Sequence, residues 1–434
     1  MTDLALRWTG LLEALSPAER ALLLERDGGA ARDLGSAVAG ILDAVRRRGD
    51  EALREFTARF DGVVLEQLEV PKARWRAALD TFDRSLVRAL ERAARQIGVA
   101  HRAWMPDAVV VETEPGVLLE RRPYPVDRVG VYAPGGRAAY PSSVLMGVVP
   151  AKVAGVGEVV VCSPPGPDGV PSAAVLAAAR LGGADRVFAL GGAQAIGAMA
   201  FGTATIPRVD RIVGPGNAYV AEAKVQVASR VGIDSPAGPS EILVVVDADA
   251  DARIVAGEMV AQAEHDPDAV AIAVVIGGPG VAGRLHAALT EAVSRAERGD
   301  IIRAALASKG GILAAESLDA AVTFANAFAA EHLLLALADA DQVRARFRVA
   351  GAVFVGLPSS VTFGDYLTGA NHVLPTAGTA RRYSGLGPEA FLRWTTYQRI
   401  SAVAARGLAA DTEVLARAEG LAGHAAAAAE WRAA

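Results

Sequence analysis

Residues 187–201 read VFALGGAQAIGAMAF, and this stretch decides the fold class of the chain. Its first four residues form an apolar run with the length of a buried strand, Gly191 and Gly192 predict a turn, and the remaining residues predict a buried helix. The uncharged stretch continues to Pro207 and matches a membrane span in length. Several glycines and Gln194 interrupt it, so a strand, a glycine turn and a buried helix are the better interpretation.

The same order of short apolar runs and helical segments extends over residues 157–232. Such alternation predicts right-handed crossovers and a parallel sheet. The expected strands are 159–162, 187–190 and 211–213, and the expected helices are 173–181, 193–201 and 218–229. These residues therefore predict one Rossmann-like unit.

A second series of apolar runs begins with Glu-Ile-Leu-Val-Val-Val at residues 241–246. The further expected strands are 269–276, 311–313, 333–337 and 351–355, with helical segments between them. The predicted fold class is therefore α/β, with two Rossmann-like domains whose sheets are largely parallel, plus small helical segments at the N-terminus and the C-terminus.

Proline-rich junctions at 123–125 and 236–239 are typical of linkers that bracket an inserted domain. The expected division is a helical N-terminal segment at 1–26, a first α/β domain made of 27–131 and 241–385, an inserted Rossmann-like domain at 132–240, and a helical C-terminal tail at 386–434. The tail is rich in alanine and has little core pattern of its own, so we expect it to pack on another surface, such as a second subunit.

The composition excludes several classes of protein. Hydrophobic residues make up 52% and charged residues 21% of the 434 residues, which indicates a globular protein with a large aliphatic core. The net charge is -5 and the basic residues are dispersed, so neither nucleic acid nor a membrane is an expected partner. Residues 1–10 lack the apolar run of a secretory signal, which makes a cytoplasmic location the default expectation. The single Cys162 has no disulfide partner and is expected to be a buried structural thiol.

Gln262 and His265 are the first candidate functional residues. They stand three residues apart where a helical segment ends, so both side chains can project from one helix face. Histidine is the commonest protein ligand for a metal such as zinc, and an amide oxygen can complete the shell. The alternative is that His265 caps helix carbonyls or is simply half-buried.

Two strand-to-helix turns, at 191–194 and 214–217, are rich in glycine, and a third at 132–137 follows a short apolar run. Glycines let a ligand approach the backbone, and a helix N-terminus offers free N–H groups to a diphosphate. The first two turns are expected at the carboxyl edge of the parallel sheet, where open α/β folds bind nucleotides. Neither matches the G-x-G-x-x-G fingerprint, so tight turns without a ligand remain an equal alternative.

Glu331 and His332 are adjacent at another expected junction between a helix and a strand. A carboxylate and an imidazole can serve as two acid–base groups if both face a cleft, whereas the alternative is a solvated Glu beside a capping His. Asp365 and His372 lie in a loop rich in Gly, Asn and Pro, where polar residues are often functional.

Taken together, these segments resemble the histidinol dehydrogenase family over nearly the whole chain. The strings that carry the resemblance are VGVYAPGG (129–136), YPSSVLM (140–146), PAKVAGV (150–156), GGAQAI (191–196), GPGN (214–217), AGPSE (237–241), QAEH (262–265), EHL (331–333) and NHVLPT (371–376). So many strings in the same order are far more specific than any one of them.

The resemblance implies a four-electron oxidation of L-histidinol to L-histidine through L-histidinal, the last steps of histidine biosynthesis. It implies two NAD+ and one zinc ion per site, in a homodimer with shared active sites. The implied zinc ligands are Gln262, His265, Asp365 and His424, of which His424 would reach the site of the other subunit.

The resemblance also assigns roles to the other candidates. Glu331 and His332 become the catalytic acid–base pair, in which His332 accepts the hydroxyl proton of the alcohol and Glu331 activates water. The implied substrate contacts are Ser240, His372 and Glu419, together with His332 and the four zinc ligands. The implied NAD-binding residues are Tyr132, Gln194 and Asn217, which places the cofactor in the inserted domain.

Two features of the sequence depart from this pattern. The metal and acid–base candidates precede expected strands, whereas ligands of parallel sheets usually gather after them, so either the sheet is mixed or the strand boundaries differ. Residue 330 is Ala where the family has Pro, and the loop 358–363 lacks its usual acidic form. The alternatives are therefore an NAD-dependent dehydrogenase of the same family that acts on another polar alcohol, amino or sulfonated, or a non-catalytic protein that binds nucleotide or zinc.

Overall fold

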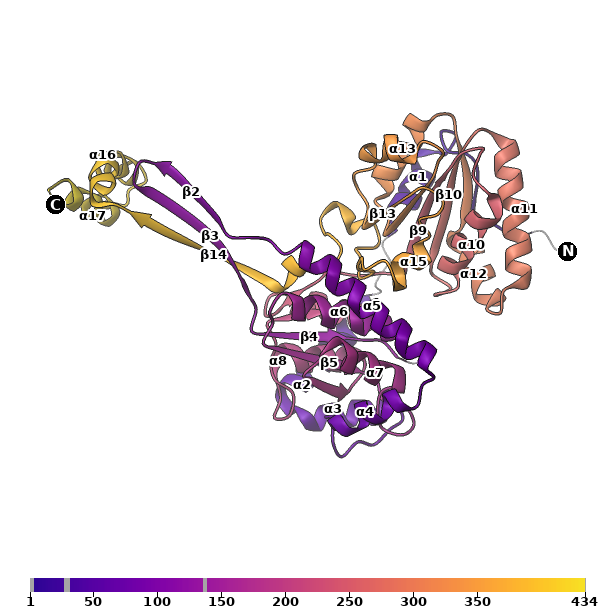
Figure 1. The fold of residues 1–434 in the computed structure, drawn as a ribbon, viewed down its shortest axis with the longest axis horizontal. Coiled ribbons are helices and arrows are strands. Elements are labelled where there is room, and N and C mark those ends of the chain that lie inside the picture. Colours follow the sequence, from indigo (N-terminus) through magenta and orange to yellow (C-terminus); the bar gives the residue numbers. More distant parts are fainter. Residues whose placement is uncertain (1–3, 27–31, 136–138, 434) are drawn as a thin grey trace. The chain divides into compact units, whose positions relative to one another are not determined.

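The computed structural model describes residues 4–26, 32–135 and 139–433. The chain forms two compact units, whose helices and strands are labelled in Figure 1. Unit 1 comprises Met1–Trp104 and Asp127–Phe391, and unit 2 comprises Met105–Val126 and Leu392–Ala434.

The first sheet of unit 1 has six strands in the order β1-β11-β10-β9-β12-β13, and every neighbouring pair is parallel. Its strands are β1 (Trp8–Leu11), β9 (Glu241–Val246), β10 (Val270–Ile276), β11 (Gly311–Ala315), β12 (His332–Ala336) and β13 (Ala352–Val355). Five of them coincide within a few residues with the expected second series. The N-terminal segment contributes the edge strand β1 in addition to the expected helix.

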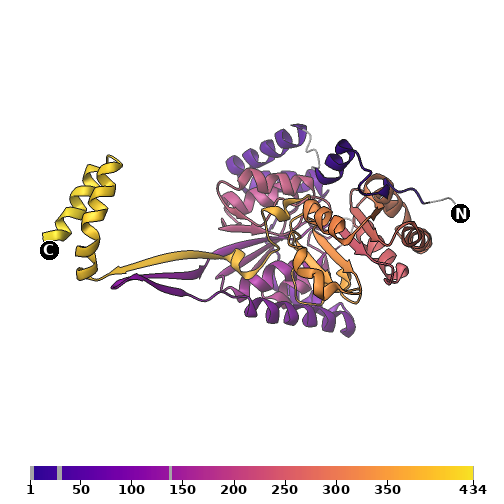
Figure 2. The same cartoon turned by 90° about the horizontal axis from the view of Figure 1, so that it is seen from above.

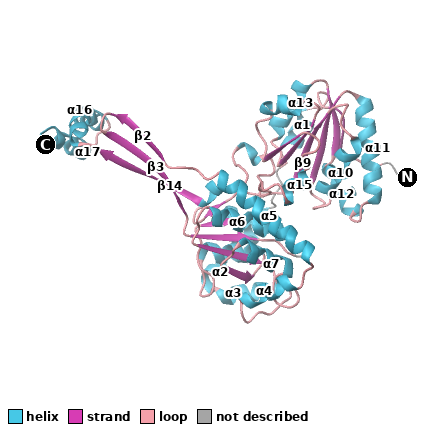
Figure 3. Ribbon diagram, viewed as in Figure 1, coloured by secondary structure: helices cyan, strands magenta, loops and turns pink. Residues whose placement is uncertain are grey.

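Helices cover both faces of this sheet, as the secondary-structure colours of Figure 3 show. They are α1 (Pro17–Leu24), α10 (Ala252–Ala263), α11 (Pro279–Arg295), α12 (Gly299–Lys309), α13 (Leu318–Phe328) and the short α14 (Ala340–Val343). In β9, Ile242 and Val244 pack with α10, α11 and α12, whereas Leu243 and Val245 pack with α1 and α13. Because both faces are buried, the strand has an uninterrupted apolar sequence.

The second sheet of unit 1 has five strands in the order β6-β5-β4-β7-β8, again all parallel. Its strands are β4 (Arg128–Tyr132), β5 (Glu158–Ser163), β6 (Arg186–Ala189), β7 (Arg211–Val213) and β8 (Gly232–Ile233). Its own helices are α6 (Pro141–Val153), α7 (Ala173–Gly182), α8 (Gly192–Phe201) and α9 (Ala218–Val227). The strand order reverses between β4 and β7, so a topological switch point lies at their carboxyl ends. The expected parallel α/β fold with two Rossmann-like halves is confirmed.

The helices between residues 32 and 103 pack on the helices of this second sheet. They are α2 (Arg32–Arg48), α3 (Asp50–Phe60), α4 (Lys72–Asp80) and α5 (Arg84–Ala103). Helix α2 contacts α8 and α9, α3 contacts α8, α4 contacts α7, and α5 contacts α6. A Cβ atom on Gly197 would lie 3.0 Å from Leu42, so α2 and α8 approach closely at a glycine. This packing differs from the expected grouping of 27–131 with 241–385, because only tertiary contacts decide which sheet an amphipathic helix covers.

Short elements complete unit 1. They are η1 (Arg344–Arg346), α15 (Val361–Tyr366), η2 (Thr379–Arg381) and η3 (Pro388–Phe391). No helix among the residues described is both long enough and apolar enough to cross a membrane.

Unit 2 is an antiparallel sheet with a pair of helices. The strands are β2 (Val109–Glu114), β3 (Val117–Pro125) and β14 (Leu392–Ile400), in the order β14-β3-β2. The helices α16 (Ala402–Ala418) and α17 (Ala422–Ala433) pack on each other (Figure 2). The two helices agree with the expected helical tail, but nine of its residues form β14. Trp394, Thr396 and other aromatic or β-branched residues favour a strand there, a pattern that the helical interpretation of the tail overlooked.

Asp61 follows α3 with a buried carboxylate whose Oδ2 atom has no hydrogen-bond partner among the described residues. Burial raises the pKa of this carboxyl to about 6, above the ordinary value of about 3.9 that it regains on unfolding. The folded state therefore binds the proton more tightly, and stability is lost as the pH rises from about 4 through 6.

We expect Asp61→Asn to raise the free energy of unfolding at pH 8 by about 1 kcal/mol, after allowing for solvent screening of a half-buried group. The gain over the parent protein should disappear below about pH 4, where the parent carboxyl is protonated in both states. Urea unfolding of both proteins between pH 3 and 8 measures this difference. A gain that does not depend on pH would contradict the explanation.

Candidate active site

The acid–base and metal candidates lie at the amino edge of the six-stranded sheet. His332 begins β12 directly after Glu331, and Glu241 begins the neighbouring strand β9. Gln262 lies in the last turn of α10, and His265 follows that helix before β10. These residues do precede their strands, and this sheet is wholly parallel among the residues described, so the possibility of a mixed sheet is excluded for it.

Glu331 and His332 are buried side by side, with 6% and 4% of their surface exposed. The Glu331 Oε2 atom accepts a hydrogen bond from the backbone N–H of Glu241 at 2.7 Å. The Nδ1–H of His332 donates to the backbone oxygen of Glu241 at 3.0 Å, and Nδ1 lies 3.5 Å from Glu331 Oε2. One residue at the start of β9 therefore orients both side chains and leaves the Nε2 atom of His332 facing Asp365, 3.6 Å from its Oδ1 atom.

The surroundings of this pair shift both protonation equilibria toward the protonated form. Burial raises the pKa of Glu331 to about 8, because water no longer stabilises the carboxylate. Burial alone would lower the pKa of His332, but the carboxylates of Glu331 and Asp365 outweigh it and raise the pKa to about 9. Groups that exchange protons near neutral pH are suited to general acid–base catalysis.

Three of the four expected metal ligands line one small pocket. The side-chain amide of Gln262 lies 3.3 Å from the imidazole of His265, measured from Nε2 to Nδ1, and Asp365 on α15 lies across the pocket. Burial lowers the pKa of His265, so its imidazole is in the neutral form that binds metals. An amide oxygen, a neutral imidazole and a carboxylate fit the preferences of zinc.

Two further observations concern the expected metal site. Within residues 4–26, 32–135 and 139–433, no group of three or more His, Cys, Asp or Glu residues is arranged to hold an ion. The fourth expected ligand, His424, lies exposed on α17 in unit 2, and Glu419 lies exposed at the end of α16. Their roles remain predictions.

His372 links the site to the helix that follows β4. Its Nδ1–H donates to the backbone oxygen of Asp365 at 2.9 Å, and its Nε2 atom lies 3.3 Å from the hydroxyl of Ser143 on α6. The neighbouring Asn371 donates to the backbone oxygen of Met146 at 2.8 Å. The sequence had assigned no role to Ser143, and its only signal was its place in the string 140–146.

The substrate candidate Ser240 directly precedes β9 and is half-buried. Its backbone oxygen accepts the N–H of Val270 at 3.0 Å, which ties it to the start of β10. Ser240 therefore lies next to Glu241, the residue that holds the acid–base pair. Sequence reasoning also assigned no role to Glu241, because its contribution comes from backbone groups that carry no sequence signal.

The cofactor candidates come together at the carboxyl edge of the five-stranded sheet. Tyr132 ends β4, and its hydroxyl accepts the backbone N–H of Gly192 at 3.1 Å. Gln194 is buried in the first turn of α8, and Asn217 caps α9. Burial raises the pKa of Tyr132 to about 12, so its hydroxyl stays neutral. The glycine turns thus lie at the expected edge, beside the switch point, although residues 136–138 of the third turn are outside the described residues.

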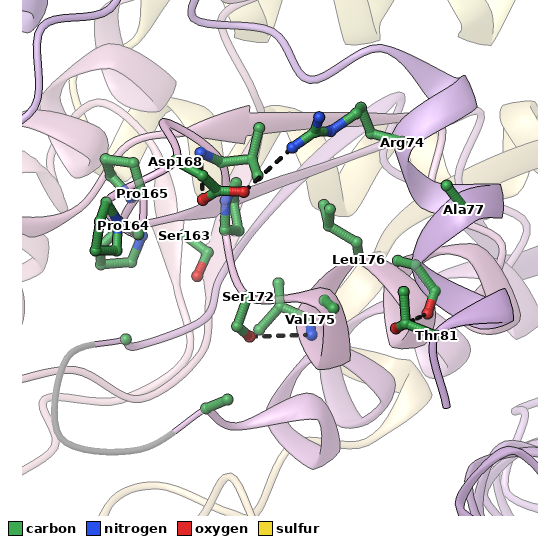
Figure 4. A pocket seen from close by; sticks show the side chains of 18 of the residues that line it. Arg74, Ala77, Thr81, Ser163, Pro164, Pro165, Asp168, Ser172, Val175 and Leu176 are labelled. Atoms are coloured by element: carbon green, nitrogen blue, oxygen red, sulfur yellow. Dashed lines mark hydrogen bonds and ion pairs between the residues drawn. The ribbon is translucent and has the colours of Figure 1, made fainter. Parts of the chain in front are cut away.

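A pocket of about 610 Å³ opens next to these turns, at the carboxyl end of β5 (Figure 4). Ser163, Ser172 and an ion pair between Arg74 and Asp168 supply polar groups, and most of the wall is apolar. Pro164 joins the pocket to the turns, since a Cβ atom on Gly191 would lie 2.7 Å from it. The size is typical of a site for a small molecule, and Glu331 and His332 do not line it.

Cys162 ends up fully buried beside this sheet edge, as the sequence predicted for a structural thiol. Burial raises the pKa of the thiol to about 12, so the thiolate does not form near neutral pH.

The chain is similar to known proteins over nearly its whole length. The family model described as histidinol dehydrogenase matches residues 24–432. The histidinol dehydrogenase of Methanosarcina mazei is 46% identical over 415 residues, which cover 95% of each chain, and that of Halobacterium salinarum is 47% identical over 95% of this chain and 96% of its own. The crystal structure of histidinol dehydrogenase from Elizabethkingia anophelis superposes with a TM-score of 0.93 at 32% identity, over 99% of this chain and 98% of that one. The chain therefore belongs to the histidinol dehydrogenase family of NAD-dependent oxidoreductases.

Proposed function

We propose that the protein oxidises L-histidinol by four electrons to L-histidine through L-histidinal, with two NAD+ and one zinc ion per site. The observation that carries this proposal is the buried pair Glu331–His332, whose imidazole lies 3.6 Å from Asp365. Asp365 in turn lines one pocket together with Gln262 and His265. Segments far apart in the sequence meet there, and membership of the family supports the same substrate.

The chemistry needs a metal and a hydride acceptor in addition to side chains. When bound, zinc supplies a redox-inert Lewis acid that grips nitrogen atoms of the substrate, and NAD+ supplies the hydride acceptor. Gln262, His265 and Asp365 would hold the metal, and His424 of the partner subunit would complete the shell. Tyr132, Gln194 and Asn217 would hold NAD+. Ser240, His372 and Glu419 would contact the substrate.

His332 is the proposed base for the alcohol. Its Nδ1 atom is engaged by the backbone oxygen of Glu241, so Nε2 is the atom that can accept the hydroxyl proton while the carbinol carbon loses hydride. Nε2 accepts this proton in the neutral imidazole, the form that predominates above the raised pKa of about 9. Glu331 then takes a proton from water as that water attacks the aldehyde. The resulting hydrate would give a second hydride to the second NAD+ and release two protons, which leaves the carboxylate. Because both side chains are buried, bulk water is kept from the aldehyde between the two steps.

The proposal includes a homodimer with shared sites. Unit 2 exposes many large apolar side chains for its size, and patches of this kind mark contact surfaces. They include Val109, Val110, Val111, Tyr397, Val403, Val414, Leu415, Leu421 and Trp431. We expect a second copy of the chain to cover this surface and to receive His424 and Glu419 in its site.

A second candidate is a dehydrogenase of the same family that acts on another polar alcohol. One observation favours it, since Val361 and Thr362, from the loop that departs from the family pattern, line the metal pocket beside Asp365. The backbone N–H of Val361 also donates to Glu258 Oε2 at 3.1 Å, which ties the loop to α10. A better kcat/KM on an amino or sulfonated alcohol without an imidazole would decide for this candidate.

The deciding experiment is the stoichiometry of NADH formation by the zinc-loaded protein with histidinol. We expect two NADH for each histidine formed, with histidine measured by chromatography. Absence of NADH from histidinol and from every other polar alcohol tested would leave only a non-catalytic binding protein. One NADH per histidinol, with the aldehyde as the final product, would contradict the second oxidation step.

A further inference from the structure

The turn at 214–217 is held by a buried ion pair that the proposed reaction does not use. Lys224 lies on α9 and Asp234 directly follows β8, and their side chains form an ion pair. Only 1% of the Lys224 side chain and 6% of the Asp234 side chain are exposed. Lysine and aspartate are seldom buried to this extent unless they are paired.

Both partners bind the backbone of Gly214, the first residue of the turn. The N–H of Gly214 donates to Asp234 Oδ2 at 2.8 Å, and Lys224 Nζ donates to the backbone oxygen of Gly214 at 3.1 Å. Gly214 has a φ angle of +115°, and a Cβ atom there would lie 2.1 Å from the backbone oxygen of Tyr132. The ion pair therefore fixes a glycine that touches the end of β4.

This glycine connects the cofactor candidates. Tyr132 touches Gly214 through its backbone and accepts the N–H of Gly192 through its hydroxyl, which fixes the turn before Gln194. Asn217 closes the Gly214 turn, and its Oδ1 atom accepts the N–H of Val220 at 3.2 Å. A shift of Gly214 would thus disturb all three residues proposed to hold NAD+.

Stability alone is a weak explanation for the pair, because well-packed apolar residues often stabilise a buried position as well as an ion pair does. The contribution of Lys224 and Asp234 is instead to orient the two peptide groups on either side of Gly214. We propose that Lys224 and Asp234 are positioning residues for dinucleotide binding, which keep the turn at 214–217 in its binding conformation before the cofactor arrives. The proposal rests on the proposed NAD-binding role of Tyr132, Gln194 and Asn217.

The test removes both charges of the pair together, since removing one would leave the other buried and unpaired and could prevent folding. Arg211, whose charged form Asp234 also favours, keeps its charge in this variant. In the double variant Lys224→Met/Asp234→Leu, we expect the Kd of NAD+ for the metal-free protein, measured by calorimetry, to rise by about tenfold or more. The KM for NAD+ should rise by a similar factor. The KM for histidinol and the zinc content should stay within about twofold, because those sites belong to the other sheet.

A control pair with the same residue types, but with 28% and 38% of its side chains exposed, lies toward the opposite edge of the same sheet. Lys152 pairs with Asp185, whose Oδ2 atom accepts the N–H of Val159 at 2.7 Å, so this pair also joins a lysine, an aspartate and a backbone group. We expect Lys152→Met/Asp185→Leu to bind NAD+ as the parent protein does. Equal losses of NAD+ affinity in the two double variants would show a general effect on the sheet and overturn the inference.

The remaining outcomes also decide. If Lys224→Met/Asp234→Leu folds by circular dichroism and binds NAD+ like the parent, the inference is wrong while the proposed function stands. If the parent itself does not bind NAD+, both fail. Should this double variant not fold, Lys224→Met/Asp234→Asn replaces it, since Asn keeps an oxygen for Gly214 N–H while neither charge of the pair remains. It should raise the Kd by about threefold, and an unchanged Kd would overturn the inference.

Discussion

His332→Asn is expected to lower kcat for histidinol oxidation by about 10³-fold, within the range of general-base catalysis. The amide of Asn can still donate to the backbone oxygen of Glu241, as Nδ1–H of His332 does at 3.0 Å, so the fold of the site should be kept. The Asn side chain has no group that accepts a proton at the position of His332 Nε2. Steady-state NADH formation, together with the zinc content and the Kd of NAD+, measures the effect.

The matched variant at the other member of the pair is Glu331→Gln. Its amide oxygen can still accept the N–H of Glu241, which Glu331 Oε2 accepts at 2.7 Å. Because the proposed task of Glu331 is to activate water, oxidation of the alcohol should continue while oxidation of the aldehyde fails. Rapid mixing should show a single NADH per site, and an aldehyde trap should collect histidinal. Equal losses in both oxidation steps would contradict the division of labour, and a kcat of His332→Asn within a few-fold of the parent would remove His332 as the base.

Mixing two inactive variants should restore activity if the sites are shared between subunits. We expect His265→Ala and His424→Ala each to lose zinc and activity, because each removes one proposed ligand. In a mixed dimer, His265 of one chain can meet His424 of the partner subunit, so one of the two sites is complete. Random assembly of equal amounts should recover roughly a quarter of the parent activity.

The control for this experiment mixes His265→Ala with Asp365→Ala. Both residues line one pocket of the same chain, so every site in a mixed dimer lacks a ligand and no activity should return. Subunit exchange is verified with differently tagged chains. If verified mixed dimers of His265→Ala and His424→Ala stay inactive, each site is built from a single chain and the proposed role of His424 is wrong.

Most of the parallel fold could be predicted from local sequence. The strands β9 and β7 match the expected residues, and β5, β6 and β10 differ by a residue or so at their ends, because strands buried on both faces are uninterrupted apolar runs. Where such a run is missing, prediction failed. The exposed strand β14 was taken for part of a helical tail, and the edge strand β1 was not foreseen.

The candidate site divides in a similar way. Gln262 and His265 could be placed together from helical spacing alone, since they belong to one turn. The resemblance named Asp365 and Glu331, but no local pattern showed that their segments meet. Backbone groups of Glu241 orient Glu331 and His332, the proposed acid–base pair, and the backbone groups that do so are present at every residue.

The sequence by itself determined the fold class, the order of the strands along the chain, the glycine turns and the family, because these depend on local periodicity and on short strings. Only the tertiary structure decided that Glu241 holds Glu331 and His332 in place, and that Asp365 lies beside His332. It also decided that the helices of residues 32–103 pack on the helices of the second sheet and that Lys224 and Asp234 hold Gly214. These facts depend on contacts between distant segments, whose energies come from burial and from hydrogen bonds formed only when the chain is folded.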